Sequence, residues 1–334
     1  MKIVVDAFGG DKAPLEIVKG ASWAVEEYGV DIVLAGDKEA LEELAAIHGI
    51  SMNRMEILHA PDIIRIEDDA VEGVKRRKQS SIVAGLEMLH RGEADGFVSA
   101  GSTAAVTVGA TLIAKRIRGI QRAAIGTLMP TTDKPVFLVD TGANTVCRPS
   151  MLLQFAVMGS IFMTYCQGVE NPRVGLLNIG AEEEKGTELQ TEAYKLLQKS
   201  GLNFVGNIEG RDVALGACDV IVADGFSGNI LLKTTEGVGM AFMSMLKGAL
   251  TKNFKTKMGG ILMMDGLRDL KHKLDYSEYG GSPLVGISAP VIKAHGSSNA
   301  KAIKNAIRQA IEFKNSGTVE HITAAIAGMK EEIG

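Results

Sequence analysis

Short apolar runs alternate along the chain with stretches of helical periodicity, and a polar, glycine-containing turn lies between most of them. The first run, residues 2–6, leads through Gly9-Gly10-Asp11 into a helix that opens at Pro14, a residue favoured in a first helical turn. Strands that alternate with helices in this way indicate βαβ units, which build a mostly parallel sheet with helices on both faces. We therefore predict a three-layer α/β/α fold, with further strands at residues 31–35, 95–99, 135–140, 173–178, 219–224 and 288–294.

Residues that favour helix ends support the predicted helices. Asp37 follows the second run as an N-cap, and Pro149 opens a long apolar helix. Further helices are predicted through Lys199 and to about Lys314, with Thr318 as the cap of a final helix. The chain has no Pro- or Ser-rich linker, so we expect one body of two lobes with a cleft: residues 1–130 and 290–334 in one lobe, residues 131–289 in the other.

Composition narrows the class of protein. The 334 residues are 46% hydrophobic and 23% charged, with a net charge of −4, which excludes disorder and a basic field for nucleic acid. The three cysteines are odd in number and form no CxxC pair, so we expect reduced thiols in a cytoplasmic protein. The N-terminus reaches Asp6 too early for a signal peptide. The uncharged stretches 96–114 and 149–169 approach the length of a membrane span, but their polar residues favour buried helices.

Glycine is the outlier of the composition, at 39 residues, and many glycines follow the predicted strands. Ligands of open parallel sheets bind beyond the carboxyl ends of the strands, and glycine lets backbone N–H groups approach an anion there. We expect these turns to converge on one side of the sheet as a shared anion site. The turns are Asp6-Gly9-Gly10-Asp11, Ser99-Gly101-Ser102-Thr103, Asp140-Gly142-Asn144, Asn178-Gly180, Asp224-Gly228-Asn229 and His295-Ser297-Ser298.

Missing motifs exclude several chemistries. The chain has no GxGxxG, no GxxxxGK[ST], no HExxH and no GxSxG, so nucleotide binding, zinc proteolysis and a serine elbow are not indicated. Four carboxylates follow strands, but such residues more often cap loops than bind a metal: Asp6, Asp11, Asp140 and Asp224. We predict neither a metal nor a cofactor.

Eight segments spread over nearly the whole chain resemble the PlsX family, the phosphate acyltransferases of bacterial phospholipid synthesis. They are residues 5–14, 99–104, 140–144, 178–186, 206–212, 224–233, 280–286 and 295–298. The resemblance implies a fold related to isocitrate and isopropylmalate dehydrogenases and phosphotransacetylases. It also implies transfer of a fatty acyl group from acyl-[acyl carrier protein] to inorganic phosphate, giving acyl phosphate. The sequence departs at Phe8, usually methionine, and at Ser282, commonly alanine, and we expect neither to touch a catalytic group.

This chemistry needs cations for phosphate, donors for an oxyanion and an acid for the leaving thiolate. We predict Lys185, Asn229, His295 and Asn144 as the catalytic residues. Cys147 is a possible acyl carrier, but phosphate is itself the nucleophile and no covalent catalysis is required. The predicted phosphate- and substrate-binding residues are Asp6, Gly9, Gly10, Asp11, Gly101, Ser102, Thr103, Arg148, Arg211, Lys233, Ser297 and Ser298.

Two basic segments predict partners. Lys75-Arg76-Arg77-Lys78 is either a solvated helix face, a docking site for the acidic carrier protein, or a phosphate contact. Residues 237–264 hold four lysines, six of the 15 methionines and no acidic residue, which is typical of a basic amphipathic hairpin on an anionic membrane. A dimer interface or core helix is the alternative for residues 237–250. The predicted membrane contacts are Met258, Ile261, Leu262, Met263, Lys252, Lys255 and Lys257.

We therefore expect a cytoplasmic homodimer bound peripherally to the inner face of the cell membrane. A candidate further partner is the downstream membrane glycerol-3-phosphate acyltransferase. Two alternatives remain: a phosphotransacetylase-like enzyme that uses acyl-CoA, and a non-catalytic membrane scaffold of lipid synthesis.

Overall fold

The computed structural model describes residues 1–274, 278 and 280–333. One eleven-stranded sheet runs through the molecule in the order β3-β2-β1-β4-β11-β10-β5-β6-β9-β7-β8. Its strands are β1 (Lys2–Asp6), β2 (Asp31–Gly36), β3 (Met55–His59), β4 (Gly96–Ser99), β5 (Ala124–Met129), β6 (Val136–Val139), β7 (Val174–Asn178), β8 (Phe204–Glu209), β9 (Val220–Val222), β10 (Ser282–Val285) and β11 (Val291–Lys293). The predicted α/β/α class and the mostly parallel pairing are confirmed, and the predicted strands lie close to the observed ones.

Two central strands, β5 and β10, reverse the direction of the sheet. The strands β3, β2, β1, β4 and β11 are parallel to one another, as are β6, β9, β7 and β8. Between these two parallel blocks, β10 is antiparallel to β11 and to β5, and β5 is antiparallel to β6. The first block and β5 therefore point one way, and the second block points the other way. The sequence pattern did not predict β5 or β10, nor the two strands at the ends of the sheet, β3 and β8.

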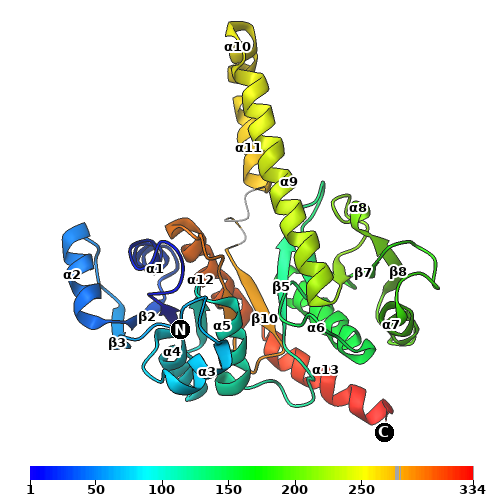
Figure 1. Ribbon diagram of the computed structural model, residues 1–334, viewed down its shortest axis with the longest axis horizontal. Helices are drawn as coiled ribbons and strands as arrows, with labels where there is room; N and C mark the ends of the chain where they lie inside the picture. The colour runs from blue at the N-terminus through cyan, green and yellow to red at the C-terminus, as the bar shows by residue number, and fades with distance from the viewer. Residues whose placement is uncertain (275–277, 279, 334) are drawn as a thin grey trace.

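Helices cover both faces of the sheet (Figure 1). One continuous apolar layer joins the sheet to α1, α12, α6 and α13, and a second lies under α3, α4 and α5. The helices of the body are α1 (Leu15–Tyr28), α2 (Lys38–His48), α3 (Ala70–Arg76), α4 (Ser81–His90), α5 (Thr103–Gly109), the π-turn Ala110–Ala114, α6 (Pro149–Gln167), α7 (Glu188–Gln198), α8 (Gly210–Val213), α12 (Ala300–Asn315) and α13 (Thr318–Ile333). The predicted division into two lobes is not decided by this continuous sheet and stays a prediction.

Several predicted helix ends are present. The Asp37 carboxylate accepts the N–H of Ala40 at 2.9 Å at the start of α2, as its N-cap. Pro149 occupies the first turn of α6. Pro14 lies one residue before α1, at the N-cap position. The chain therefore begins these helices where the sequence signals lie, within one residue.

Helix α6 is long and apolar enough to cross a membrane by length and composition, and 61% of its apolar window is buried inside the protein. It packs in the first apolar layer, where Phe162 stacks on Phe137 of β6 with ring centroids 4.4 Å apart. The stretch 96–114 is not one helix, because it contains β4, a turn, α5 and the π-turn. Both stretches thus fit the buried alternative.

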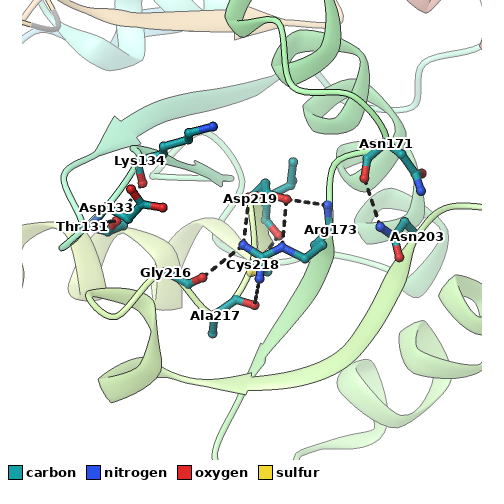
Figure 2. A network of polar contacts seen from close by, with 11 residues as sticks. Thr131, Asp133, Lys134, Asn171, Arg173, Asn203, Gly216, Ala217, Cys218 and Asp219 are labelled. Carbon is teal, nitrogen blue, oxygen red and sulfur yellow. Dashed lines mark hydrogen bonds and ion pairs between the residues drawn. The ribbon is translucent and has the colours of Figure 1, made fainter.

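A polar network ties the amino ends of β7 and β9 together (Figure 2). The Arg173 guanidinium donates to both carboxylate oxygens of Asp219, at 3.0 and 3.1 Å, and to the carbonyl oxygens of Gly216 and Ala217 at 3.1 Å. A bidentate pair of this kind fixes geometry as well as charge. The network stabilises the second parallel block.

A helical arm projects from the body (Figure 1). It comprises α9 (Gly225–Thr251), α10 (Phe254–Leu262) and α11 (Met264–Leu274). Along the 27 residues of α9, only Gly225 and Gly228 are buried, both in its first turn. The chain therefore sends a largely unburied apolar helix away from its core.

Candidate functional site

A cavity of about 750 Å³ lies where the first parallel block meets β5, β10 and α9. Ten of the sixteen residues predicted as catalytic or substrate-binding line it: Asp6, Gly9, Gly10, Asp11, Gly101, Ser102, Thr103, Asn229, Lys233 and His295. They come from the turns after β1, β4 and β11 and from one face of α9. Sequence segments nearly 290 residues apart thus meet in one cavity.

The turn after β1 is built around the buried Asp6 carboxylate. The Ser99 hydroxyl donates to Asp6 Oδ2 at 2.6 Å, and the N–H of Phe8 donates to Oδ1 at 3.3 Å. A Cβ on Gly9 would lie 2.3 Å from Asp6 Oδ2 and 2.6 Å from the Gly101 nitrogen, so only glycine fits there. Burial raises the pKa of Asp6 above its usual value. Gly9 thus lets the turn after β1 and the turn after β4 approach each other at the cavity wall.

Helix α9 contributes the opposite wall through residues spaced by three or four positions: Asn229, Leu232, Lys233 and Glu236. The Asp224 side chain caps this helix, accepting the N–H groups of Phe226 and Ser227 at 3.0 and 2.9 Å. Lys233 Nζ lies 2.8 Å from Glu236 Oε2 and 3.3 Å from His295 Nε2. Lys233 is therefore a half-exposed cationic side chain on the α9 wall of the cavity.

His295 follows β11 and faces Lys233. Its Nδ1 lies 2.8 Å from the Ser297 hydroxyl and accepts the N–H of Ser297 at 3.2 Å. Burial and then the Lys233 charge lower the pKa of His295 below its usual value of about 6.5. The imidazole is therefore mostly neutral at pH 7, and it is a poor proton donor there.

The loop after β3 forms the rim of the cavity with Ile63, Arg65 and Ile66. Arg77 holds this loop: its guanidinium donates to Asp62 Oδ1 at 3.2 Å, to the Ile63 carbonyl at 2.6 Å and to Asp68 Oδ1 at 3.2 Å. The prediction grouped Arg77 with three neighbours as a docking surface. The Arg77 guanidinium instead forms hydrogen bonds within the fold, whereas Lys75, Arg76 and Lys78 are exposed.

Sequence reasoning missed a set of cavity residues from the sheet itself: Lys293, Ser282, Thr127 and Thr141. Lys293 is the last residue of β11 and lies inside the predicted strand 288–294, so it was not among the turn residues that were considered for the site. Thr127 and Ser282 lie on β5 and β10, two of the four strands that were not predicted. Phe8 and Ser282, the two positions at which the motifs depart from the family pattern, both line the cavity, and whether either touches a catalytic group stays a prediction.

Six predicted site residues do not line the cavity. Lys185, Arg148 and Arg211 are exposed side chains that follow β7, β6 and β8, strands of the second block. The prediction assumed that all strands point the same way. Because β5 and β10 reverse the sheet, these strands end at the opposite edge from β1, β4 and β11. The turns after β7 and β8 therefore do not line the cavity, whereas Thr141 and Gly142 of the turn after β6, and the helix α9 that follows β9, do line it with the turns of the first block.

The other three are Asn144, Ser297 and Ser298. The Asn144 amide donates to the Ala123 carbonyl at 2.8 Å and to Asp140 Oδ2 at 2.9 Å, so both its N–H groups serve the fold. Ser297 contacts His295 from outside the cavity lining. The Ser298 hydroxyl is buried and has no hydrogen-bond partner among the described residues.

Metal and covalent alternatives gain no support from the described residues. Asp140 accepts the N–H groups of Ile125, Gly142, Ala143 and Asn144, and Asp224 caps α9, so both carboxylates are used in loops. No group of three His, Cys, Asp or Glu among the described residues is placed to hold a metal. Burial raises the pKa of Cys147 to about 11, so its thiol is protonated at pH 7.

Comparison with solved structures places the fold among phosphotransacetylases. The EutD phosphotransacetylase from Staphylococcus aureus matches over 95% of this chain and 94% of its own, with a TM-score of 0.60 and 17% identity. A phosphotransacetylase from Streptococcus pyogenes matches 94% of each chain, with a TM-score of 0.63 and 19% identity. At these identities the likeness shows the fold alone. The chain therefore has the α/β fold of these phosphotransacetylases.

Sequence comparison is more specific. A family model described as "Fatty acid synthesis protein" matches residues 1–321. The phosphate acyltransferases of Thermoanaerobacterium thermosaccharolyticum and Thermoanaerobacter pseudethanolicus are 45% and 46% identical, each covering 100% of this chain and 99% of the relative. The chain belongs to the phosphate acyltransferase family, which confirms the resemblance seen in its motifs, and it is an acyltransferase of lipid synthesis.

Proposed function

We propose that this enzyme transfers a fatty acyl group from acyl-[acyl carrier protein] to inorganic phosphate, and that the reaction takes place in the 750 Å³ cavity. One observation carries the assignment of the site: polar and cationic groups, Lys233, Lys293 and His295, share one cavity with apolar side chains. Phosphate needs the first set, and a fatty acyl chain needs the second. The apolar lining includes Phe8, Ile63, Ile82, Leu128 and Leu232.

The reaction requires two substrates side by side. A phosphate oxygen attacks the thioester carbonyl carbon, and the C=O electron pair moves to oxygen. When this pair returns, the C–S bond breaks and the thiolate leaves with acyl phosphate as the other product. Lys233 and the backbone N–H groups of the glycine turns hold the phosphate, and Asn229 donates to the developing oxyanion.

The donor is tested by assaying the same acyl chain on carrier protein and on CoA. We expect acyl phosphate from the carrier-bound donor at a kcat/KM at least ten times that of acyl-CoA. A preference for acyl-CoA would favour the alternative of a phosphotransacetylase-like enzyme. The solved phosphotransacetylases have the same fold as this chain. If substitutions in the cavity abolish acyl phosphate formation, the protein is an enzyme and not a non-catalytic scaffold.

We propose that the exposed cations Lys75, Arg76 and Lys78 steer the acidic carrier protein toward the cavity rim. Arg76 pairs with Glu72 at 2.8 Å on the exposed face, and such surface pairs hold little energy. Lys75→Glu with Lys78→Glu should raise KM for the carrier-bound donor and leave the rate with small thioesters unchanged. If the variant and the wild type have equal kinetics with the carrier-bound donor, these cations do not dock the carrier protein.

We propose that the tip of the arm binds an anionic membrane. Leu262 is 86% exposed and Phe254 79%, with Met258, Ile261 and Met263 also exposed beside Lys252, Lys255 and Lys257. Each lysine near an anionic surface contributes about 1 kcal/mol, screened by salt, while the apolar part is not. Ile261→Ser, Leu262→Ser and Met263→Ser together should abolish sedimentation with anionic vesicles. Wild-type binding by this variant would exclude the tip, and the glycerol-3-phosphate acyltransferase would become the candidate membrane link.

We propose that the shaft of the arm pairs with a second copy. Val238, Met240, Phe242 and Met245 are exposed along α9, which is unusual for a helix of a monomer. Sedimentation at micromolar concentration should give a dimer of twice 35.4 kDa, and Phe242→Glu with Met245→Glu should weaken it. A monomeric wild type would contradict this assembly. We further propose a cytoplasmic enzyme bound peripherally at the inner face of the membrane.

We keep Lys185 as a proposed catalytic residue although it lies outside the cavity of this chain. It forms no ion pair among the described residues, and three glutamates precede it, so no structural task accounts for it. A neighbouring copy or a shift of residues 179–187 would have to bring it to the substrates. Lys185→Ala should lower activity by about 10- to 100-fold without changing thermal stability. Unchanged kinetics would remove Lys185 from the site.

A further inference from the structure

A row of polar side chains crosses the floor of the cavity on five adjacent strands. Lys293 of β11 is in register with Ser99 of β4 on one side and with Ser282 of β10 on the other. The row continues through hydrogen bonds: Ser99 Oγ to Asp6 Oδ2 at 2.6 Å, and Ser282 Oγ to Thr127 Oγ1 at 2.7 Å. Residues opposite one another in a sheet point to the same face, so this row faces one space.

Lys293 is the cation at the centre of this row. Its side chain is only 8% exposed, and it lines the cavity. Its Nζ donates to the Ala294 carbonyl, and it forms no ion pair with a described residue. An ammonium group has three N–H donors, so donors remain for a molecule in the cavity.

The other basic groups of the cavity are poorly suited to give up a proton. Lys233 is half exposed and bound to Glu236, and His295 is mostly neutral at pH 7. The third basic group is Arg65, and a guanidinium does not act as a proton donor in proteins. The leaving alkyl sulfur nevertheless ends as a free thiol, and the proton that it gains comes formally from the attacking hydrogen phosphate.

We propose that Lys293 is the catalytic acid that protonates the leaving sulfur, an inference that rests on the proposed acyl transfer from a thioester to phosphate. Hydrogen phosphate attacks the carbonyl carbon, the C–S bond breaks, and its electron pair stays on sulfur. The Lys293 ammonium then gives its proton to that sulfur, forming the free thiol. The neutral amine takes back the proton that hydrogen phosphate loses in becoming the acyl phosphate dianion. Atoms and charge balance without another reactant.

The surroundings support this assignment. Burial lowers the pKa of Lys293 to about 8, close to that of a thiol at about 8.5, so the proton passes between groups of similar affinity. Asp6 and Asp11 oppose this shift, and Lys233 adds to it. His295, Glu236, Arg65 and Glu67 are the remaining titratable groups that line the same cavity.

Matched small thioesters of one acyl chain test the proposal. One carries an alkyl thiol, and the other carries 4-nitrothiophenol, whose thiolate leaves without a proton. Lys293→Met and Lys293→Arg should lower kcat with the alkyl thioester by about 10²- to 10⁴-fold and change the phosphate KM less than about threefold. With the aryl thioester, both variants should recover most of the wild-type rate. Lys233→Met is the control, because loss of a phosphate contact should slow both thioesters equally.

Wild-type enzyme supplies a test that needs no variant. Because the acid must be protonated, kcat for the alkyl thioester should fall as pH rises through about 8, and this limb should be absent for the aryl thioester. Equal losses of Lys293→Met on both thioesters, or full activity of Lys293→Arg, would overturn the acid role. Wild-type enzyme inactive with every thioester would overturn the proposed function instead.

Discussion

The two parallel blocks of the sheet carry the same sequence pattern and use it differently. In the first block, the glycine turns after β1, β4 and β11 line the cavity. In the second, the turns after β7 and β8 lie at the opposite edge, and the described polar side chains bind one another, as Asn178 does with the Lys185 carbonyl at 2.9 Å. From the second block, only the turn after β6, with Thr141 and Gly142, and the helix after β9 reach the cavity, so a polar turn at a strand end does not by itself mark a binding residue.

The largest expected effect concerns two of the buried aspartates, Asp6 and Asp140. Asp140 accepts hydrogen bonds from four backbone N–H groups and the Asn144 amide, whereas Asp6 accepts from one backbone N–H and the Ser99 hydroxyl. Asp140→Ala should lower the free energy of unfolding by about 3–5 kcal/mol, because several buried donors lose their acceptor. Urea titration measures it. Asp6→Ala should cost less stability and more activity; the reverse order would break the comparison.

The second effect is a pH dependence of stability. The pKa of Lys293 in the fold is about 8, below that of an unfolded lysine at about 10.4, so the unfolded chain binds more protons between these values. Stability therefore rises with pH over this window, by up to about 3 kcal/mol. The difference in unfolding free energy between wild type and Lys293→Met should change between pH 7 and 10.5. A constant difference would mean that the ammonium is not buried in the working fold.

The third effect is on catalysis alone. Lys233→Ala should raise the phosphate KM or lower kcat/KM by about 10- to 100-fold, the loss expected for one charge-assisted contact of roughly 1.5–3 kcal/mol. Its matched control is Lys195→Ala, an exposed lysine on α7 paired with Glu192 at 2.7 Å, which should leave kinetics unchanged. Equal effects of the two substitutions would mean that the cavity wall does not bind phosphate.

The smallest effect separates charge from geometry in the basic segment. Arg77→Lys keeps the charge but loses the fork that holds Asp62, Ile63 and Asp68, so it should cost about 1 kcal/mol and several-fold in activity. Arg76→Lys keeps an exposed charge and should be silent. Equal kinetics for both would show that the loop after β3 needs no such support.

The sequence was sufficient where local signals decide structure. Apolar runs, Asp37 and Pro149 located strands and helix starts, and the glycine turns located ten cavity residues. It failed where long-range pairing decides. Nothing local marks β5 and β10 as antiparallel, so Thr127 and Ser282 were missed and Lys185 was placed in the site. Lys293 was missed because it lies inside the predicted strand 288–294, and only the turn residues after each strand were considered for the site.

Helix α9 is continuous from the cavity to the arm, and this sets a distance. At 1.5 Å per residue, the 18 steps from Lys233 to Thr251 span about 27 Å. A membrane surface bound by the tip would therefore lie about 27 Å or more from Lys233 in the cavity. The helix therefore acts as a spacer between the cavity and the tip of the arm. Deleting whole helical turns would keep the faces of α9 aligned. It would change only the distance that an amphiphilic product covers between the cavity and a surface bound by the tip.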